Sequence, residues 1–115
     1  MRRGEIRLTD LEPVRGTEAS KRRPAVIVSN DRANTTAERL GRGVVTVVPV
    51  TSNTARVFPF QTLLTAGSTG LRVDGKAQAE QVRSVAVERL GPVLGRVPAG
   101  VMAQLDDALR LHLAL

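Results

Sequence analysis

The run VVTVVPV, residues 44–50, decides the fold of this chain, because five of its seven residues are valine. A continuous β-branched run of this length is the strongest strand signal in the chain. A second run, RPAVIVS at residues 23–29, carries a proline near its start, where a missing N–H does least harm. The run at residues 23–29 is typical of a central strand, and Pro49 marks the end of the strand at residues 44–50 or an edge position.

Weaker strand patterns lie on both sides of these two runs. Residues 4–11, GEIRLTDL, alternate apolar and polar side chains and predict a half-buried strand. Residues 58–65 predict another strand, and residues 76–87 predict one or two more. Loops are predicted at the polar residues 13–22 and 30–43. Turns or breaks are predicted at residues 51–53, 67–70, 74–75, 91–92 and 95. Of these, Asp74-Gly75 indicates a hairpin if strands flank it.

Near the C-terminus, the spacing of the apolar residues changes from that of a strand to that of a helix. Apolar positions recur at helical spacing, at Val101, Leu105, Ala108, Leu109, His112 and Leu113. Pro98 suits the first turn of this helix, and His112 on the apolar stripe predicts a packing residue rather than a catalytic base. Five to seven short strands followed by one helix of about four turns predict a mainly β fold, a compact antiparallel barrel with the helix against it.

Length and composition restrict the classes of protein that this chain can be. With 115 residues and 12.3 kDa, it is expected to form a single domain over residues 1–115. Cysteine is absent and His112 is the only histidine, which excludes thiolate chemistry and any site built from several histidines. No apolar run approaches the ~20 residues of a membrane span. The N-terminus does not resemble a secretory signal, so we expect a cytoplasmic protein without a membrane partner.

The net charge of +6 is concentrated in one half of the chain. Residues 1–58 hold eleven basic and six acidic side chains, whereas residues 59–115 hold six and five. A one-sided positive field favours polyanionic partners such as nucleic acid or an acidic protein. Because Phe58 and Phe60 are the only aromatic residues, a broad stacking platform for single strands is not available.

Two polar segments adjoin the central strands and are candidates for a site. Residues 16–24, GTEASKRRP, bring three basic side chains and two hydroxyls to the start of a strand, where a side chain is both rigid and exposed. Residues 49–53, PVTSN, place hydroxyls at the end of the valine-rich strand. A solvated basic loop and an ordinary turn are the plain alternatives. Asp106 and Asp107 predict a solvated helix face, and no set of acidic residues has the spacing of metal ligands.

Seven segments in order carry a family resemblance: RGEI at 3–6, DLEPVRGTE at 10–18, RRPAVIVSND at 22–31, VPVTSN at 48–53, FPF at 58–60, EQVR at 80–83 and LDDAL at 105–109. Together they resemble the MazF/PemK family of toxins along essentially the whole chain. The resemblance implies an SH3-like antiparallel β-barrel of the CcdB/MazF type with a C-terminal α-helix. It also implies a sequence-selective endoribonuclease, or mRNA interferase, from a type II toxin–antitoxin pair.

The resemblance assigns roles to individual positions. Arg23 falls on the family's catalytic arginine and Thr51 on its catalytic threonine. Thr17 stands where members usually have serine, Glu18 matches the acidic residue beside the site, and Gln81 falls on a polar position near the cleft. Residues 19–22, ASKR, depart from the commoner Gln-Gly-Gly, which implies a stiffer and more basic loop with an altered RNA preference.

The implied chemistry uses the 2′-hydroxyl of RNA as the nucleophile, with no metal and no cofactor. Arg23 would mainly stabilise the phosphorane by bidentate N–H contacts, because a guanidinium is a poor proton donor or acceptor, and a general acid/base role for Arg23 is the alternative. Thr51 would bond a non-bridging oxygen or the attacking hydroxyl, and Glu18 would either orient Arg23 or act as the base. The products would be a 2′,3′-cyclic phosphate and a 5′-hydroxyl. The expected RNA-binding residues are Arg15, Thr17, Lys21, Arg22, Ser52, Asn53 and Gln81.

Three partners follow from this interpretation. They are single-stranded RNA, a cognate acidic antitoxin of the MazE kind, and a second copy of the chain, which would cover apolar strand surface near residues 44–50. Two rival functions stay open: a CcdB-like gyrase-binding toxin and a non-catalytic RNA-binding module. The joint presence of Arg23-Pro24 and Thr51-Ser52 argues against both.

Overall fold

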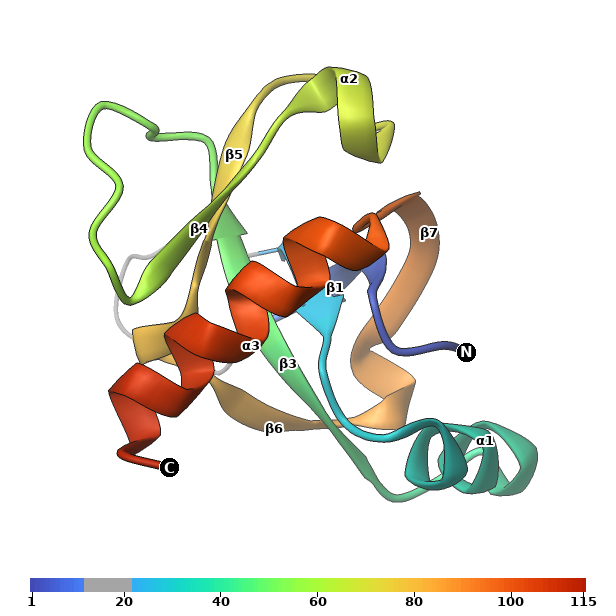
Figure 1. Ribbon diagram of the computed structural model, residues 1–115. Helices are drawn as coiled ribbons and strands as arrows, with labels where there is room; N and C mark the ends of the chain where they lie inside the picture. Colours follow the sequence, from blue (N-terminus) through green and yellow to red (C-terminus); the bar gives the residue numbers. More distant parts are fainter. Residues whose placement is uncertain (12–21) are drawn as a thin grey trace, which may run out of the picture.

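The computed structural model describes residues 1–11 and 22–115, which form an antiparallel sheet with helices packed against it (Figure 1). The described strands are β1 (Glu5–Asp10), β2 (Arg22–Ile27), β3 (Val44–Thr51), β4 (Gln61–Leu64), β5 (Gly75–Gln78), β6 (Arg83–Ala86) and β7 (Leu90–Arg96). The helices are α1 (Asp31–Leu40), α2 (Ala66–Thr69) and α3 (Ala99–Leu113), with short 3-10 turns η1 (Ala79–Gln81) and η2 (Val87–Arg89). The prediction of a mainly β fold with a C-terminal helix is confirmed.

Strands β2 and β3 lie side by side within the sheet, which confirms that residues 23–29 form a central strand and shows that residues 44–50 form one as well. β2 and β3 pair antiparallel, with Ala25 opposite Pro49 and Ile27 opposite Val47. Neighbouring residues of β3 point into different cores, Val47 into one and Val48 into the other. The strand is therefore apolar along its length because both of its faces are covered. Val44 is 62% exposed, but the other valines of the run are buried within this chain, so the apolar surface expected near residues 44–50 is not there.

Pro49 lies inside β3, not at its end, and is buried there. β3 pairs with β6 up to Val47 and with β5 from Val50 onward. The proline therefore occupies the interval in which β3 changes partner, and its missing N–H removes no bond from either of these ladders.

The sheet curls without closing among the described residues. Its strand order is β4-β5-β3-β2-β1-β7, with β6 paired to β3 beside this path. The loop at the tip of the β4–β5 hairpin nevertheless reaches β7, since a Cβ built on Gly70 would lie 3.8 Å from the Cα of Gly95. A Cβ on Gly95 would in turn collide with the carbonyl oxygen of Thr69. The expected barrel is thus an open sheet whose ends touch through glycine backbone.

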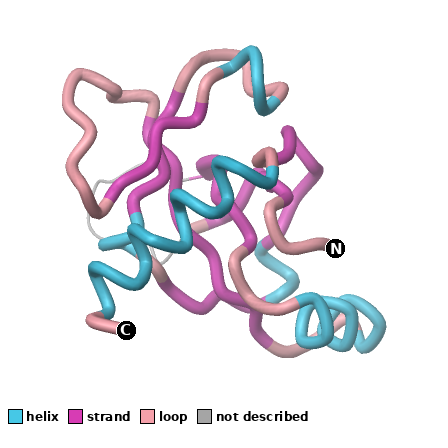
Figure 2. Tube along the Cα trace, viewed as in Figure 1, coloured by secondary structure: helices cyan, strands magenta, loops and turns pink. Residues whose placement is uncertain are grey.

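The C-terminal helix covers one face of the sheet, as Figure 2 shows. It begins after Pro98 and buries Met102, Leu105 and Ala108 against the sheet. The predicted apolar stripe continues to residue 113, but the last turn of α3 is exposed, and His112 with it. The prediction that His112 packs is therefore wrong, because the helix runs past the surface that it covers.

The predicted loop at residues 30–43 is mostly a helix, α1. The side chain of Asn30 accepts a hydrogen bond from the backbone N–H of Ala33 at 2.8 Å, and Gly41 ends the helix with a positive φ of 66°. The buried residues of α1 are Asn34 and Ala37, so its covered face has no stripe of large apolar side chains to mark a helix in the sequence. Contacts from the N-terminus hold this helix in place: the Met1 ammonium donates to Glu38 at 2.8 Å, and the Arg3 N–H donates to Asp31 at 2.6 Å.

Three smaller expectations are also corrected. Residues 91–95 do not break the chain but form the middle of β7, where Gly91 and Gly95 allow close packing. The strand predicted at residues 58–65 is limited to β4. Asp74-Gly75 is not a two-residue hairpin turn, because Gly75 already pairs with Leu64 and the loop spans residues 65–74, including α2.

Candidate active site

The register of the central strands brings Arg23 and Thr51 together. Ala25 is opposite Pro49, and continuing this register by two residues along each strand places Arg23 opposite Thr51. Residues opposite each other in an antiparallel pair project from the same face of the sheet. A basic residue near the start of β2 and a hydroxyl at the end of β3 are therefore neighbours although 28 positions separate them in the sequence.

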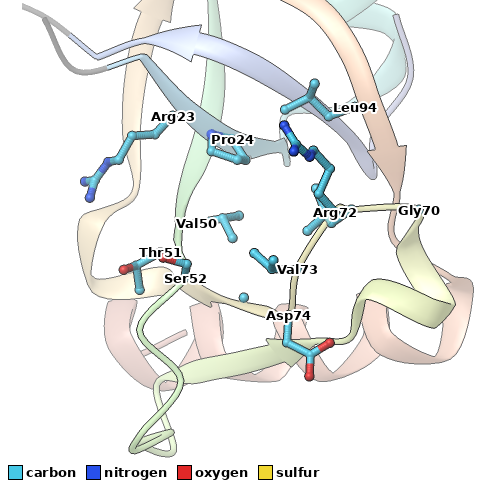
Figure 3. Close-up of a pocket in the computed structure, with 12 residues that line it drawn as sticks. Arg23, Pro24, Val50, Thr51, Ser52, Gly70, Arg72, Val73, Asp74 and Leu94 are labelled. Atoms are coloured by element: carbon cyan, nitrogen blue, oxygen red, sulfur yellow. The ribbon is translucent and has the colours of Figure 1, made fainter.

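A cavity of about 540 Å³ opens at this point of the sheet (Figure 3). Arg23, Thr51 and Ser52 line one side of it, and the loop that carries Arg72 and Val73 lines another. Pro24 and Val50 form the floor between them. Three residues that the sequence singled out thus share one cavity.

The side chain of Arg23 has an unused donor. Its Nε is buried and makes no hydrogen bond, and its guanidinium forms no ion pair with a described residue. A buried polar group without a partner costs about 1–3 kcal/mol. Such a group is expected where a ligand completes the bonding, and the ligand that suits a guanidinium is an oxyanion.

Thr51 is held by a hydrogen bond that leaves its proton available. The backbone N–H of Asn53 donates to Thr51 Oγ1 at 3.2 Å, and Asn53 Oδ1 accepts the N–H of Ala55 at 3.3 Å. Because the Thr51 oxygen already accepts one bond, its O–H is free to donate to an anion in the cavity. Ser52 and Asn53 are exposed at the start of the loop that follows β3.

Strand β5 supports Thr51 from behind. Thr51 pairs with Lys76, and a Cβ on the neighbouring Gly75 would lie 2.7 Å from Val50 Cγ1 and 3.1 Å from the Thr51 carbonyl oxygen. Lys76 is buried, and its Nζ donates to the carbonyl oxygen of Arg56 at 2.6 Å. Gly75 therefore allows β5 to pack closely against β3, and the hydrogen bond from Lys76 holds the loop that follows Thr51 against β5.

The other predicted site residues are placed differently. Arg22 is exposed and extends toward β7, where its Nη2 lies 3.4 Å from the position of a Cβ on Gly91, and it does not line the cavity. Gln81 is exposed in η1 and does not line it either. Arg15, Thr17, Glu18 and Lys21 lie outside the described residues.

Sequence reasoning missed Arg72, Val73 and Leu94, which also line the cavity. Turns were predicted on either side of Arg72 and Val73, at residues 67–70 and 74–75, and Leu94 lay in a segment predicted to be broken by glycines. The available signal was the glycine pattern itself, because Gly70, Gly75 and Gly95 are the points at which the hairpin approaches β3 and β7. A guanidinium, a hydroxyl and an apolar wall in one cavity can hold an oxyanion together with an apolar group attached to it.

Within the described part of the chain, no helix is long and apolar enough to cross a membrane.

Comparison with known proteins gives consistent results. Residues 2–113 match the family described as the PemK-like, MazF-like toxin of type II toxin–antitoxin systems. The chain is 69% identical over 115 residues to endoribonuclease MazF9 of Mycobacterium tuberculosis (strain ATCC 25618 / H37Rv), covering 100% of this chain and 98% of that protein. It is 55% identical over 93 residues to the probable endoribonuclease MazF1 of the same strain, covering 78% and 98%. A MazE-MazF crystal structure from Deinococcus radiodurans is similar with a TM-score of 0.77 at 29% identity, covering 100% and 96%.

Proposed function

The chain belongs to the PemK-like, MazF-like toxin family, and we propose that it is the endoribonuclease toxin of a type II toxin–antitoxin system, cutting single-stranded RNA by attack of the 2′-hydroxyl. The names of its relatives support the reaction class. The observation that supports the site is the orphaned, buried Nε of Arg23 opposite Thr51 in one cavity.

In this reaction the negative charge that develops on the phosphorane must be stabilised, and no histidine is needed to transfer protons. The 2′-oxygen gives its proton to Glu18 or to a water molecule and attacks the phosphorus, while the bond to the 5′-oxygen breaks and that oxygen takes a proton from water. The products are a 2′,3′-cyclic phosphate and a 5′-hydroxyl. Arg23 donates two N–H bonds to the phosphorane oxygens, and Thr51 donates its O–H to one of them. Glu18 either orients Arg23 or accepts the 2′ proton.

RNA on either side of the scissile phosphate is held by the remaining predicted residues. Ser52 and Asn53 are exposed beside Thr51 and offer hydroxyl and amide groups to the backbone. Arg15, Thr17, Lys21 and Arg22 belong to the basic segment that precedes and begins β2, and Gln81 would contact RNA beyond the cavity. No metal and no cofactor take part in this mechanism.

The proposed partners follow from charge and from the family. A cognate acidic antitoxin of the MazE kind would neutralise the +6 chain, and a MazE-MazF structure is among the similar solved structures. We also propose a homodimer in the cytoplasm. Exposed leucines at the end of α3, Leu111, Leu113 and Leu115, provide apolar surface that a second copy would cover. Sedimentation at 12.3 kDa at micromolar concentration would contradict the dimer.

The two rival functions receive no support. The relatives named above are called endoribonucleases, and none of those names mentions gyrase. A non-catalytic RNA-binding module would not need a threonine hydroxyl that is positioned opposite an arginine without a hydrogen-bond partner for its Nε.

A direct assay tests the proposal. Purified protein is incubated with a pool of single-stranded RNAs in excess EDTA, and the new ends are identified. We expect sequence-selective cuts with 5′-hydroxyl and 2′,3′-cyclic phosphate ends. Intact RNA after treatment with the free toxin, or cuts that require an added divalent metal, would contradict it.

A further inference from the structure

The cavity at the active site is larger than a phosphate needs, and its far side has a different chemistry. Arg23, Thr51 and Ser52 form the polar side. The loop before β5 and strand β7 add the apolar side chains of Leu71, Val73 and Leu94 to the lining, which together are called the apolar wall. In Figure 3 the guanidinium of Arg23 and the hydroxyl of Thr51 lie on the same side, whereas Arg72 and Leu94 lie opposite. A charged phosphate gains nothing from an apolar wall, because burial there costs hydration.

The apolar side suits a flat group with apolar faces. A volume of about 540 Å³ lies within the range of about 300–1,000 Å³ that is typical of pockets enclosing small ligands. In single-stranded RNA the group nearest to the scissile phosphate with apolar faces is a base of one of its two nucleotides. Unstacked bases are commonly received between apolar side chains and arginine planes.

Arg72 supplies a polar group that can contact the edge of such a base. Its side chain is exposed and forms no hydrogen bond or ion pair with another described residue. The carboxylate of the nearby Asp74 is occupied differently, since its Oδ1 accepts the backbone N–H of Ala66 at 2.7 Å. The guanidinium of Arg72 is therefore free to donate to base acceptors, with a fixed fork that discriminates between bases.

The wall is built in advance of binding. Gly70 adopts a positive φ of 87°, Leu71 donates its N–H to Thr69 Oγ1 at 3.2 Å, and Asp74 ties the other end of the loop to α2. Close packing at Gly75 and Gly95 fixes the loop between β3 and β7. A preformed pocket loses little entropy when it accepts a base.

We infer that the apolar side of this cavity is a nucleobase pocket for a nucleotide that flanks the scissile phosphate, with Val73 and Leu94 contacting the base and Arg72 contacting its edge. This inference rests on the proposed endoribonuclease function. It makes the loop of residues 70–74 a determinant of which RNA sequence is cut.

The test combines an abasic scan with a variant that fills the pocket. Each base of a bound RNA oligonucleotide is removed in turn, and affinity is measured by fluorescence anisotropy for the wild type and for Val73→Trp. If the wild type cuts the oligonucleotide, a single 2′-deoxyribose at the cut site keeps the RNA intact during the binding measurement. If the wild type does not cut it, the oligonucleotide is used without this substitution. Val93→Trp is the matched control, because Val93 is exposed on β7 beside Leu94 but does not line the cavity.

The inference predicts one position at which loss of the base weakens wild-type binding about tenfold or more. Val73→Trp should bind the intact and the abasic RNA equally, both at the weakened level, whereas Val93→Trp should behave as the wild type. Arg72→Ala should reduce the preference among the four bases at this position, and Arg39→Ala on α1 should not.

Two results would overturn the inference. One is that Val73→Trp remains as sensitive as the wild type to removal of a base at every position. The loss of affinity from the missing base and the loss from the substitution would then add. The other is that Val73→Trp weakens binding of the acidic antitoxin and leaves the abasic profile of RNA unchanged, which would assign the cavity to a protein partner. If the wild type cuts no RNA, the proposed function fails, but the binding comparison still decides whether the pocket holds a base.

Discussion

We expect Arg23 to contribute most to the proposed mechanism, because it supplies the charge that stabilises the phosphorane and its buried Nε has no hydrogen-bond partner. Replacing Arg23 by alanine should lower the cleavage rate about 10²–10³-fold, the loss typical of one transition-state contact. Arg23→Lys should restore little, since a point charge cannot reproduce the planar fork. Single-turnover rates measure both variants, with Arg39→Ala on α1 as the control for loss of charge. If Arg23→Ala cleaves RNA at the wild-type rate, the assignment of Arg23 to the active site is wrong.

Thr51 should act through its hydroxyl and not through its bulk. Thr51→Ala should slow single-turnover cleavage, and Thr51→Ser should retain most of the rate because serine keeps the donor and the acceptor for the N–H of Asn53. Thr54→Ala in the same loop is the matched control. Equal rates for the alanine and serine variants of Thr51 would show that the hydroxyl is not used.

At the level of strands and helices, the position of Thr51 depends on the close approach of β5. A Cβ at Gly75 would lie 2.7 Å from Val50 Cγ1, so Gly75→Ala should force β5 away from β3 and destabilise the fold by about 1–3 kcal/mol. Cleavage should fall with it. Urea unfolding measures the stability, and Gly67→Ala is the control because nothing lies within 4 Å of its Cβ position. Unfolding midpoints that match for the two variants would contradict the packing argument.

Helix α1 should be sensitive to acid. The hydrogen bond from the N-terminal ammonium lowers the pKa of Glu38 below its ordinary value, and the backbone N–H of Arg3 lowers that of Asp31. A lowered folded-state pKa stabilises the fold above the unfolded-state pKa, and this stabilisation is lost as the pH falls below about 4. Glu38→Gln should therefore flatten the acid limb of the stability profile measured by urea unfolding. Glu88→Gln should leave it unchanged, and an unchanged profile for Glu38→Gln would contradict the assignment.

The sequence predicted those elements whose signal is local. The β-branched runs of β2 and β3 were both predicted as strands, and that of β2 as a central one, because strands whose two faces are covered need apolar side chains along their length. Helix α1 was missed because its stability comes from the Asn30 cap and from contacts with Met1 and Arg3, about thirty residues away. β7 was missed because Gly91 and Gly95, which allow close packing in the fold, are turn signals in the sequence.

The candidate site was predicted in part. Arg23 and Thr51 were identified through motif resemblance, and the strand register that places them opposite each other was not visible in the sequence. Arg72, Val73 and Leu94 join the cavity through the contact of the β4–β5 hairpin with β7, which no local pattern encodes.

For the molecule as a whole, charge and chemistry agree. The net charge of +6 favours a polyanionic substrate and an acidic inhibitor, and the cavity offers an arginine and a hydroxyl to a phosphate. The chain's one histidine lies exposed on α3 and does not line the cavity. The account therefore depends on a nucleophile that the RNA itself carries.

One measurement tests this central claim most directly. The wild-type protein is given its mapped RNA substrate and the same oligonucleotide with a single 2′-deoxyribose on the 5′ side of the scissile phosphate, and binding and cleavage are both recorded. We predict that the substituted oligonucleotide binds with similar affinity and stays intact, because the attacking oxygen has been removed. Cleavage of the substituted oligonucleotide at the same bond would show that water is the nucleophile and would contradict the account.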